Sequence, residues 1–221
     1  MIRRTTLTAA TCGVAAAALL LTACGGSKTD DAKITTSPPT TTATPTTPTP
    51  TPPATTPPAD PKAPVFDFPK DVTFDIQTPK TGDPVKDTIL RDHGYAIKAI
   101  QLAYVKQNPD LPVFEAYTTG QGRVSWATNI KEYRAKDETV TGHMQYYDFK
   151  VTVTNATTAG VSYCEDQTQS FDKDAKTGKV NRDAPDPSDY VGWSDLMKKS
   201  TSGTWQVAGS TMKRGVSECA R

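Results

Sequence analysis

The sequence predicts an α+β domain in which two to three N-terminal helices pack on an antiparallel sheet of about four strands. Between residues 85 and 136, apolar residues recur every three or four positions, as on the buried face of a helix; from His143 to Thr154 they alternate with polar ones, as in a strand. The 3 Trp, 8 Tyr and 6 Phe all follow residue 62, so only residues 63–221 can form a packed core. Helices followed by antiparallel strands are typical of a sheet with one covered face.

Three segments account for the predicted helices. The first begins after Asp83, an N-cap residue followed by Pro84 at the first helical position, and runs over residues 85–107. Residues 110–117 can form a short second helix. Gly120 and Gly122 are interpreted as a turn, and a third helix is predicted from about residue 124 to 136.

Four strands follow in the prediction. The first includes residues 143–154, the second begins at 161 and extends to about 171, and the last two cover 190–197 and 204–211. Residues 172–188 are polar and contain Gly and Pro, so they are predicted to be mostly loop.

The N-terminus has the pattern of an export signal. Arg3 and Arg4 precede an apolar stretch over residues 7–21, which is shorter than the roughly 20 residues of a membrane-spanning helix. Small residues directly before Cys24 resemble the lipobox of bacterial lipoproteins. The resemblance implies that residues 1–23 are a signal peptide, cleaved after Ala23, and that Cys24 carries a diacylglycerol. The alternative is an uncleaved apolar segment in which Cys24 is an ordinary small residue.

Residues 24–62 are predicted to be the lipidated Cys24 followed by a disordered stalk. Residues 35–58 contain 12 Thr and 9 Pro, a composition that cannot offset the entropy of ordering. The prolines favour extended polyproline II, so the stalk could span about 70 Å. The prediction is therefore a domain, residues 63–221, held by a lipid anchor on the extracytoplasmic face of the cell membrane.

The predicted domain is similar to the nuclear-transport-factor-2-like superfamily. The similarity rests on the order of helices and strands, on the strand segment Val161-Ser-Tyr-Cys164, and on the late hairpin ending in Gly203-Thr-Trp-Gln-Val207. With the lipobox, the stalk and the C-terminal Cys219, the chain resembles small actinobacterial lipoproteins of unassigned function. The resemblance implies a strongly curved sheet that forms a cone with a pocket at its open end. A cystatin-like or other α+β arrangement stays open.

The four cysteines divide into two groups. Cys12 would leave with the signal peptide and Cys24 would carry lipid, which leaves Cys164 and Cys219 as a pair in an oxidising compartment. We predict a disulfide between them that ties the C-terminal tail to the second strand. The alternative is two free thiols.

Four residues are candidates for the lining of a pocket. His143 begins the first strand, and strict alternation places Tyr147 and Phe149 on its face. Tyr104 and Tyr133 occupy helical faces that can point to the same space. The candidate pocket residues are thus Tyr104, Tyr133, His143 and Tyr147.

The sequence contains no convincing catalytic set. Asp148 falls on the opposite face from His143 by alternation, and His93, between Asp92 and Gly94, is expected to be a solvated surface residue. No nucleophile elbow, phosphate loop or zinc-protease motif occurs, and we predict neither a cofactor nor a metal.

The predicted function is therefore binding. The formal net charge of +1 gives no reason to expect nucleic acid. We expect a lipid-anchored, non-enzymatic domain that binds an envelope component, a protein partner or a small apolar ligand. The alternative, from the resemblance, is a pocket enzyme of the isomerase, cyclase or dehydratase class.

Overall fold

The computed structural model describes residues 63–221, in which a short strand precedes three helices and the remaining strands follow them. The predicted signal peptide, the lipid site Cys24 and the predicted stalk lie outside the described residues. The helices are α1 (Pro84–Val105), α2 (Pro112–Tyr117) and α3 (Gly120–Ala135). The strands are β1 (Val72–Ile76), β2 (Glu138–Asn155), β3 (Thr158–Asp174), β4 (Val180–Asn181), β5 (Tyr190–Lys199) and β6 (Trp205–Arg214). No helix within residues 63–221 has the length and apolar character needed to cross a membrane.

Helix α1 begins where the sequence predicts. The carboxylate of Asp83 accepts hydrogen bonds from the backbone N–H groups of Val85, at 2.8 Å, and Lys86, at 3.2 Å, and Pro84 occupies the first turn. These bonds satisfy donors that would otherwise lack partners at the helix start. The predicted N-cap is confirmed.

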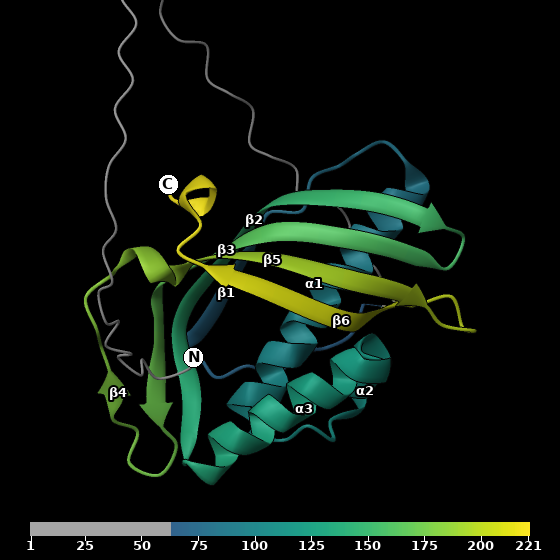
Figure 1. Cartoon of the computed structure of the whole chain (residues 1–221). Coiled ribbons are helices and arrows are strands. Elements are labelled where there is room, and N and C mark those ends of the chain that lie inside the picture. The colour runs from purple at the N-terminus through teal and green to yellow at the C-terminus, as the bar shows by residue number, and fades with distance from the viewer. Residues whose placement is uncertain (1–62) are drawn as a thin grey trace, which may run out of the picture. The chain divides into compact units, whose positions relative to one another are not determined.

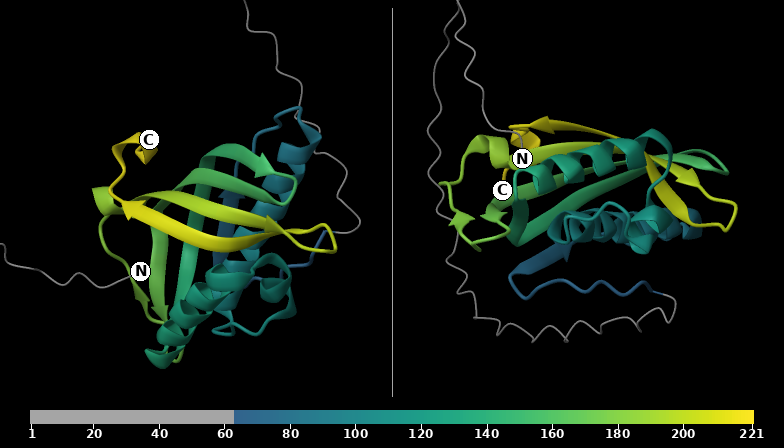
Figure 2. Two further views of the ribbon diagram at one scale, coloured as in Figure 1. Left: turned by 45° about the vertical axis from the view of Figure 1, so that its right-hand side comes forward. Right: turned by 90° about the horizontal axis from the view of Figure 1, so that it is seen from below.

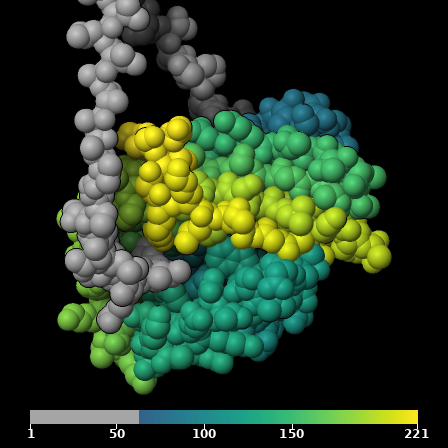
Figure 3. All heavy atoms as spheres, in the orientation of Figure 1, coloured from purple at the N-terminus to yellow at the C-terminus, as the bar shows by residue number. Residues whose placement is uncertain are grey.

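The predicted start of the third helix is wrong. Gly120 and Gly122 belong to the first turn of α3 rather than to a preceding turn. A Cβ on Gly122 would lie 2.6 Å from the carbonyl carbon of Ala208, so only glycine allows the helix to approach the backbone of β6 this closely. In the space-filling view of Figure 3, α3 and β6 meet along one seam.

The sheet is mixed and larger than predicted. Its order is β1-β2-β3-β5-β6, with β4 paired to β3; β1 runs parallel to β2 and the other pairs are antiparallel. The four predicted strands correspond to β2, β3, β5 and β6. The prediction missed β1, and it missed β4 inside the region predicted to be mostly loop.

Helices cover one face of the curved sheet. Figures 1 and 2 show β2, β3, β5 and β6 curving together across one side of the three helices. The main core lies between α1 and this concave face. It includes Ile89, Leu90, Met144, Tyr146, Phe149, Val161, Tyr163, Met197, Trp205 and Val207.

The predicted strict alternation along β2 is wrong beyond Tyr147. The pairing of β2 with β3 shifts register between Tyr147 and Lys150, and Asp148 between them has a φ of +54°. This bulge adds one residue, so Phe149 joins the concave core with Tyr146, while Tyr147 packs in a separate cluster. His143, Tyr147 and Phe149 therefore do not share one face as predicted.

Candidate functional site

The predicted pocket residues lie in three places. Tyr104 of α1 and Tyr133 of α3 are together, with ring centroids 5.1 Å apart, in a cluster that also holds Trp126. Burial raises the pKa of both phenols, so they remain protonated. The structure brings these two tyrosines together as helix packing residues.

His143 and Tyr147 are placed elsewhere. His143 lies at the junction of β1 and β2, where its Nδ1 is 2.8 Å from the Oγ1 of Thr73. Tyr147 donates a hydrogen bond to the backbone carbonyl of Cys219, and the guanidinium of Arg221 stacks 3.3 Å from its ring centroid. The four candidates thus do not line a common pocket.

The predicted disulfide between Cys164 and Cys219 is present. The two Cα atoms are 5.5 Å apart, within the range that a disulfide requires. The bond joins β3 to the C-terminal segment, and Cys219 is only 2% exposed beside Tyr147. The terminal segment is therefore fixed to the sheet.

The predicted exposure of His93 is wrong. Its residue exposure is 0%, and its Nε2 lies 2.8 Å from the Oδ2 of Asp195 on β5. The hydroxyl of Tyr163 donates to the same oxygen at 3.2 Å. His93 follows Ile89 and precedes Ile97 by one helical turn, so helical spacing could have placed it on the buried stripe of α1.

Glu165 is the centre of a second cluster of buried polar side chains, and it was not among the residues predicted from the sequence. Tyr146 donates its hydroxyl hydrogen to Oε1 at 2.9 Å, and the indole N–H of Trp193 donates to Oε2 at 2.7 Å. Burial raises the pKa of the Glu165 carboxyl, and the two donors partly oppose this. Alternation with Val161 and Tyr163 along β3 is the signal that places it inside.

Aromatic rings occupy the space beside these polar groups. Tyr163 stacks on Phe149 with centroids 5.2 Å apart and on Trp193 at 6.2 Å. Trp193 also lies 5.5 Å from Trp126 of α3. Around Tyr163 and Trp193, side chains therefore fill the concave side of the sheet.

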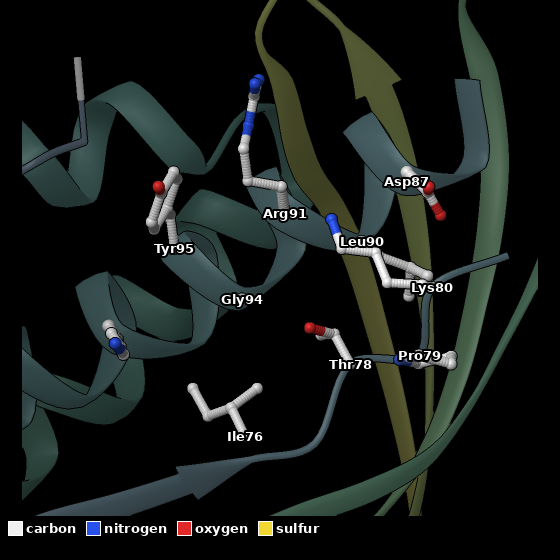
Figure 4. A pocket seen from close by; sticks show the side chains of 10 residues that line it. Ile76, Thr78, Pro79, Lys80, Asp87, Leu90, Arg91, Gly94 and Tyr95 are labelled. Carbon is white, nitrogen blue, oxygen red and sulfur yellow. The ribbon is translucent and has the colours of Figure 1, made fainter. Parts of the chain in front are cut away.

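An open groove lies outside the core, between α1 and the loop that follows β1 (Figure 4). Its volume is about 240 Å³. Asp87, Leu90, Arg91, Gly94, Tyr95 and Lys98 line it from one face of α1, and Ile76, Thr78, Pro79 and Lys80 line it from the strand end and loop. Three of these ten residues are cationic and one is acidic. The groove could not be predicted from the sequence, because its two walls meet only in the folded chain.

No metal site accompanies these features. Within residues 63–221, no group of three or more His, Cys, Asp and Glu side chains is placed to hold a metal ion.

Comparisons with known proteins give weak likenesses. No family model matches the sequence, and no curated protein matches it. Among solved structures, a ketosteroid isomerase-like protein from Erwinia carotovora atroseptica is 22% identical, with 58% of this chain and 94% of that one covered and a TM-score of 0.38. A scytalone dehydratase candidate from Novosphingobium aromaticivorans is 12% identical, with 58% and 87% covered and a TM-score of 0.41. A domain of unknown function with a cystatin-like fold from Nostoc punctiforme is 16% identical, with 62% and 79% covered and a TM-score of 0.32.

At TM-scores below 0.5, these likenesses carry no inference about activity. The description of the fold stands on the chain's own elements: three helices on one face of a curved, mixed sheet, with strand β1 before the helices and the other strands after them.

Proposed function

We propose that this chain is an exported lipoprotein whose domain binds a ligand or partner at the extracytoplasmic face of the membrane, without acting as an enzyme. Support for the anchor comes from the sequence around Cys24 and from the positive and apolar segments before it. The Cys164–Cys219 disulfide fits this location, because disulfides persist in oxidising compartments.

We propose binding rather than catalysis because side chains fill the concave face of the sheet. Phe149, Tyr163 and Trp193 stack on the concave side of the sheet, where the resemblance implies a pocket, and the two carboxylates there, Glu165 and Asp195, accept hydrogen bonds from neighbouring side chains. A ligand is more readily accommodated in the groove along α1, which is open to solvent.

The anchor is tested by the variant Cys24→Ser, with Cys12→Ser as the matched control. Two acyl chains give stable membrane anchoring, since each buried CH₂ contributes roughly 0.8 kcal/mol. Cys24→Ser should appear in the soluble fraction or accumulate as a precursor that retains residues 1–23, whereas Cys12→Ser should behave like the parent. Membrane fractionation and the mass of the N-terminal peptide measure both outcomes. A Cys24→Ser protein that is still cleaved and membrane-bound would refute the anchor.

One observation favours the pocket enzyme as a second candidate. Asp195 borders a surface cleft of about 440 Å³, and neither its Oδ1 nor the Nδ1 of His93 has a hydrogen-bond partner among residues 63–221. Catalysis would require His93 to exchange a proton with a bound molecule.

Modification by diethyl pyrocarbonate distinguishes the two candidates, because the chain has only 2 His. The folded protein should react at His143, which is partly exposed, and remain unmodified at His93, which is buried. Peptide mapping by mass spectrometry identifies the modified residue. Rapid modification of His93 in the folded protein would favour the enzyme.

A further inference from the structure

The groove along α1 combines an apolar base with a cationic rim. Ile76 and the mostly buried Leu90 form the apolar base, and Gly94 adds no side chain; a Cβ there would contact only Ile76 Cγ2, at 3.9 Å. Lys80 enters from the loop, while Arg91 and Lys98 lie two helical turns apart on α1. In Figure 4 the loop carrying Thr78, Pro79 and Lys80 faces the helix across this space.

The charged side chains at the rim of the groove, Lys80, Asp87, Arg91 and Lys98, differ in the partners that they contact. Asp87, the one acidic residue of the lining, accepts hydrogen bonds from the backbone N–H of Thr81 at 2.8 Å and from its hydroxyl at 2.7 Å. Arg91 binds Asp92 through Nε and Nη2. Neither Lys80 nor Lys98 forms a salt bridge in the described part of the chain. The hydrogen bonds from Thr81 lower the pKa of Asp87, and the charge of Lys80 helps to lower it further. The ammonium group of Lys98 lies 5.9 Å from the ring centroid of Phe66. The lining thus carries three cationic side chains and one acidic side chain, an excess of positive charge.

We propose that this groove binds a small organic anion, with a carboxylate or phosphate group between Lys80 and Lys98 and an apolar body against Ile76, Leu90 and Gly94. This inference names the ligand class of the proposed binding function and rests on it. The groove's volume lies just below that of typical small-molecule sites, so the ligand has on the order of ten non-hydrogen atoms. The cations supply charge-assisted hydrogen bonds, and the base supplies hydrophobic contact.

The test compares ligands of one shape and different charge. The full-length chain, purified from its host in detergent, is titrated by calorimetry with phenylacetate, phenyl phosphate, phenylacetamide and phenethylammonium. Phenylacetate or phenyl phosphate should bind at least about fivefold more tightly than the neutral amide, and the ammonium should bind least. The preference should weaken as salt is raised, because the rim is exposed. Equal binding of the amide and the anions, or no binding of either anion at millimolar concentration, would overturn the proposal.

Variants assign the binding to the groove. Lys98→Gln and Lys80→Gln should each weaken anion binding about twofold to fivefold. Gly94→Leu should fill the groove and abolish binding without unfolding the protein, since a Cβ at Gly94 meets only Ile76 Cγ2 at 3.9 Å and leucine is the better helix former. Lys131→Gln, an exposed lysine of α3, is the matched control and should leave binding unchanged. Undiminished binding by Gly94→Leu would place the ligand elsewhere.

Failure of this inference can be distinguished from failure of the proposed function. If Cys24→Ser releases the protein but no anion binds the groove, the anchored binding protein stands and this ligand class is wrong. If anions bind but Cys24→Ser remains anchored and processed, the groove stands and the lipoprotein is wrong.

Discussion

Buried polar side chains are the main feature of this domain at the scale of single residues. His93 and Asp195 are 0% and 4% exposed, and their 2.8 Å contact joins α1 to β5. A buried polar group is costly when it lacks a partner, so such a contact favours one position of the helix on the sheet. The pair thus acts with the apolar core to define how α1 docks.

Glu165 should make stability depend on pH. Because burial raises its pKa in the folded protein above the ordinary value of 4.5, the folded chain keeps a proton that the unfolded chain loses as pH rises from 4.5. Its contribution to the free energy of unfolding is therefore greatest below pH 4.5 and falls as pH rises through the folded pKa. The variant Glu165→Gln does not titrate, so its stability relative to the parent should improve across that interval.

Urea unfolding of both proteins between pH 4 and pH 8 measures this difference. Glu115→Gln, an exposed glutamate of α2, controls for the loss of a carboxylate in general. Parallel stability profiles for Glu165→Gln and the parent would mean that Glu165 does not hold its proton more tightly in the folded state.

At the scale of elements, β2 is shaped by two departures from ideal strand geometry. Asp148 forms the bulge that brings Phe149 into the core on the side of Tyr146, and Gly142 has a φ of +104° where β1 and β3 pair on either side. Such features curve a strand and redirect its side chains. They explain why the long alternating pattern of β2 does not give one apolar face.

Replacing Gly142 should be strongly destabilising. A Cβ there would lie 2.1 Å from the carbonyl oxygen of Gln169, and its positive φ disfavours any other residue. Gly142→Ala should reduce the free energy of unfolding by about 3 kcal/mol. Gly160→Ala is the matched control, since nothing lies within 4 Å of its Cβ position in β3. Thermal unfolding compares the two variants. Equal Tm values for Gly142→Ala and Gly160→Ala would show that a Cβ at residue 142 does not clash.

At the scale of the whole domain, the disulfide connects segments 55 residues apart in sequence. Closing a loop of this length restricts the unfolded chain and stabilises the fold by about 4 kcal/mol in the chain-entropy description. Reduction, or the double variant Cys164→Ser with Cys219→Ser, should therefore lower the Tm by about 10 °C. Calorimetry with and without reductant measures this. An unchanged Tm in the double variant would show that the C-terminal segment holds its place through contacts such as Arg221 on Tyr147.

Features encoded locally could be predicted from the sequence. The cap at Asp83 and the period of α1 lie within one segment, and the Cys164–Cys219 pairing was predicted from the number of cysteines and the oxidising compartment expected for them. β1 was missed although Val72, Phe74 and Ile76 alternate with polar residues, because a five-residue pattern is weak and its partner β2 begins more than sixty residues later.

The sequence by itself determined the order of the three helices and of strands β2, β3, β5 and β6, and it predicted the cysteine pair, because these depend on short-range spacing or on composition. Only the tertiary structure decided the parallel pairing of β1, the burial of His93 against Asp195, the Glu165 group and the groove between Lys80 and Lys98. The physical reason is that each of these joins residues that are distant in sequence. Their contacts depend on bulges, close backbone approaches and packing angles that no local periodicity contains.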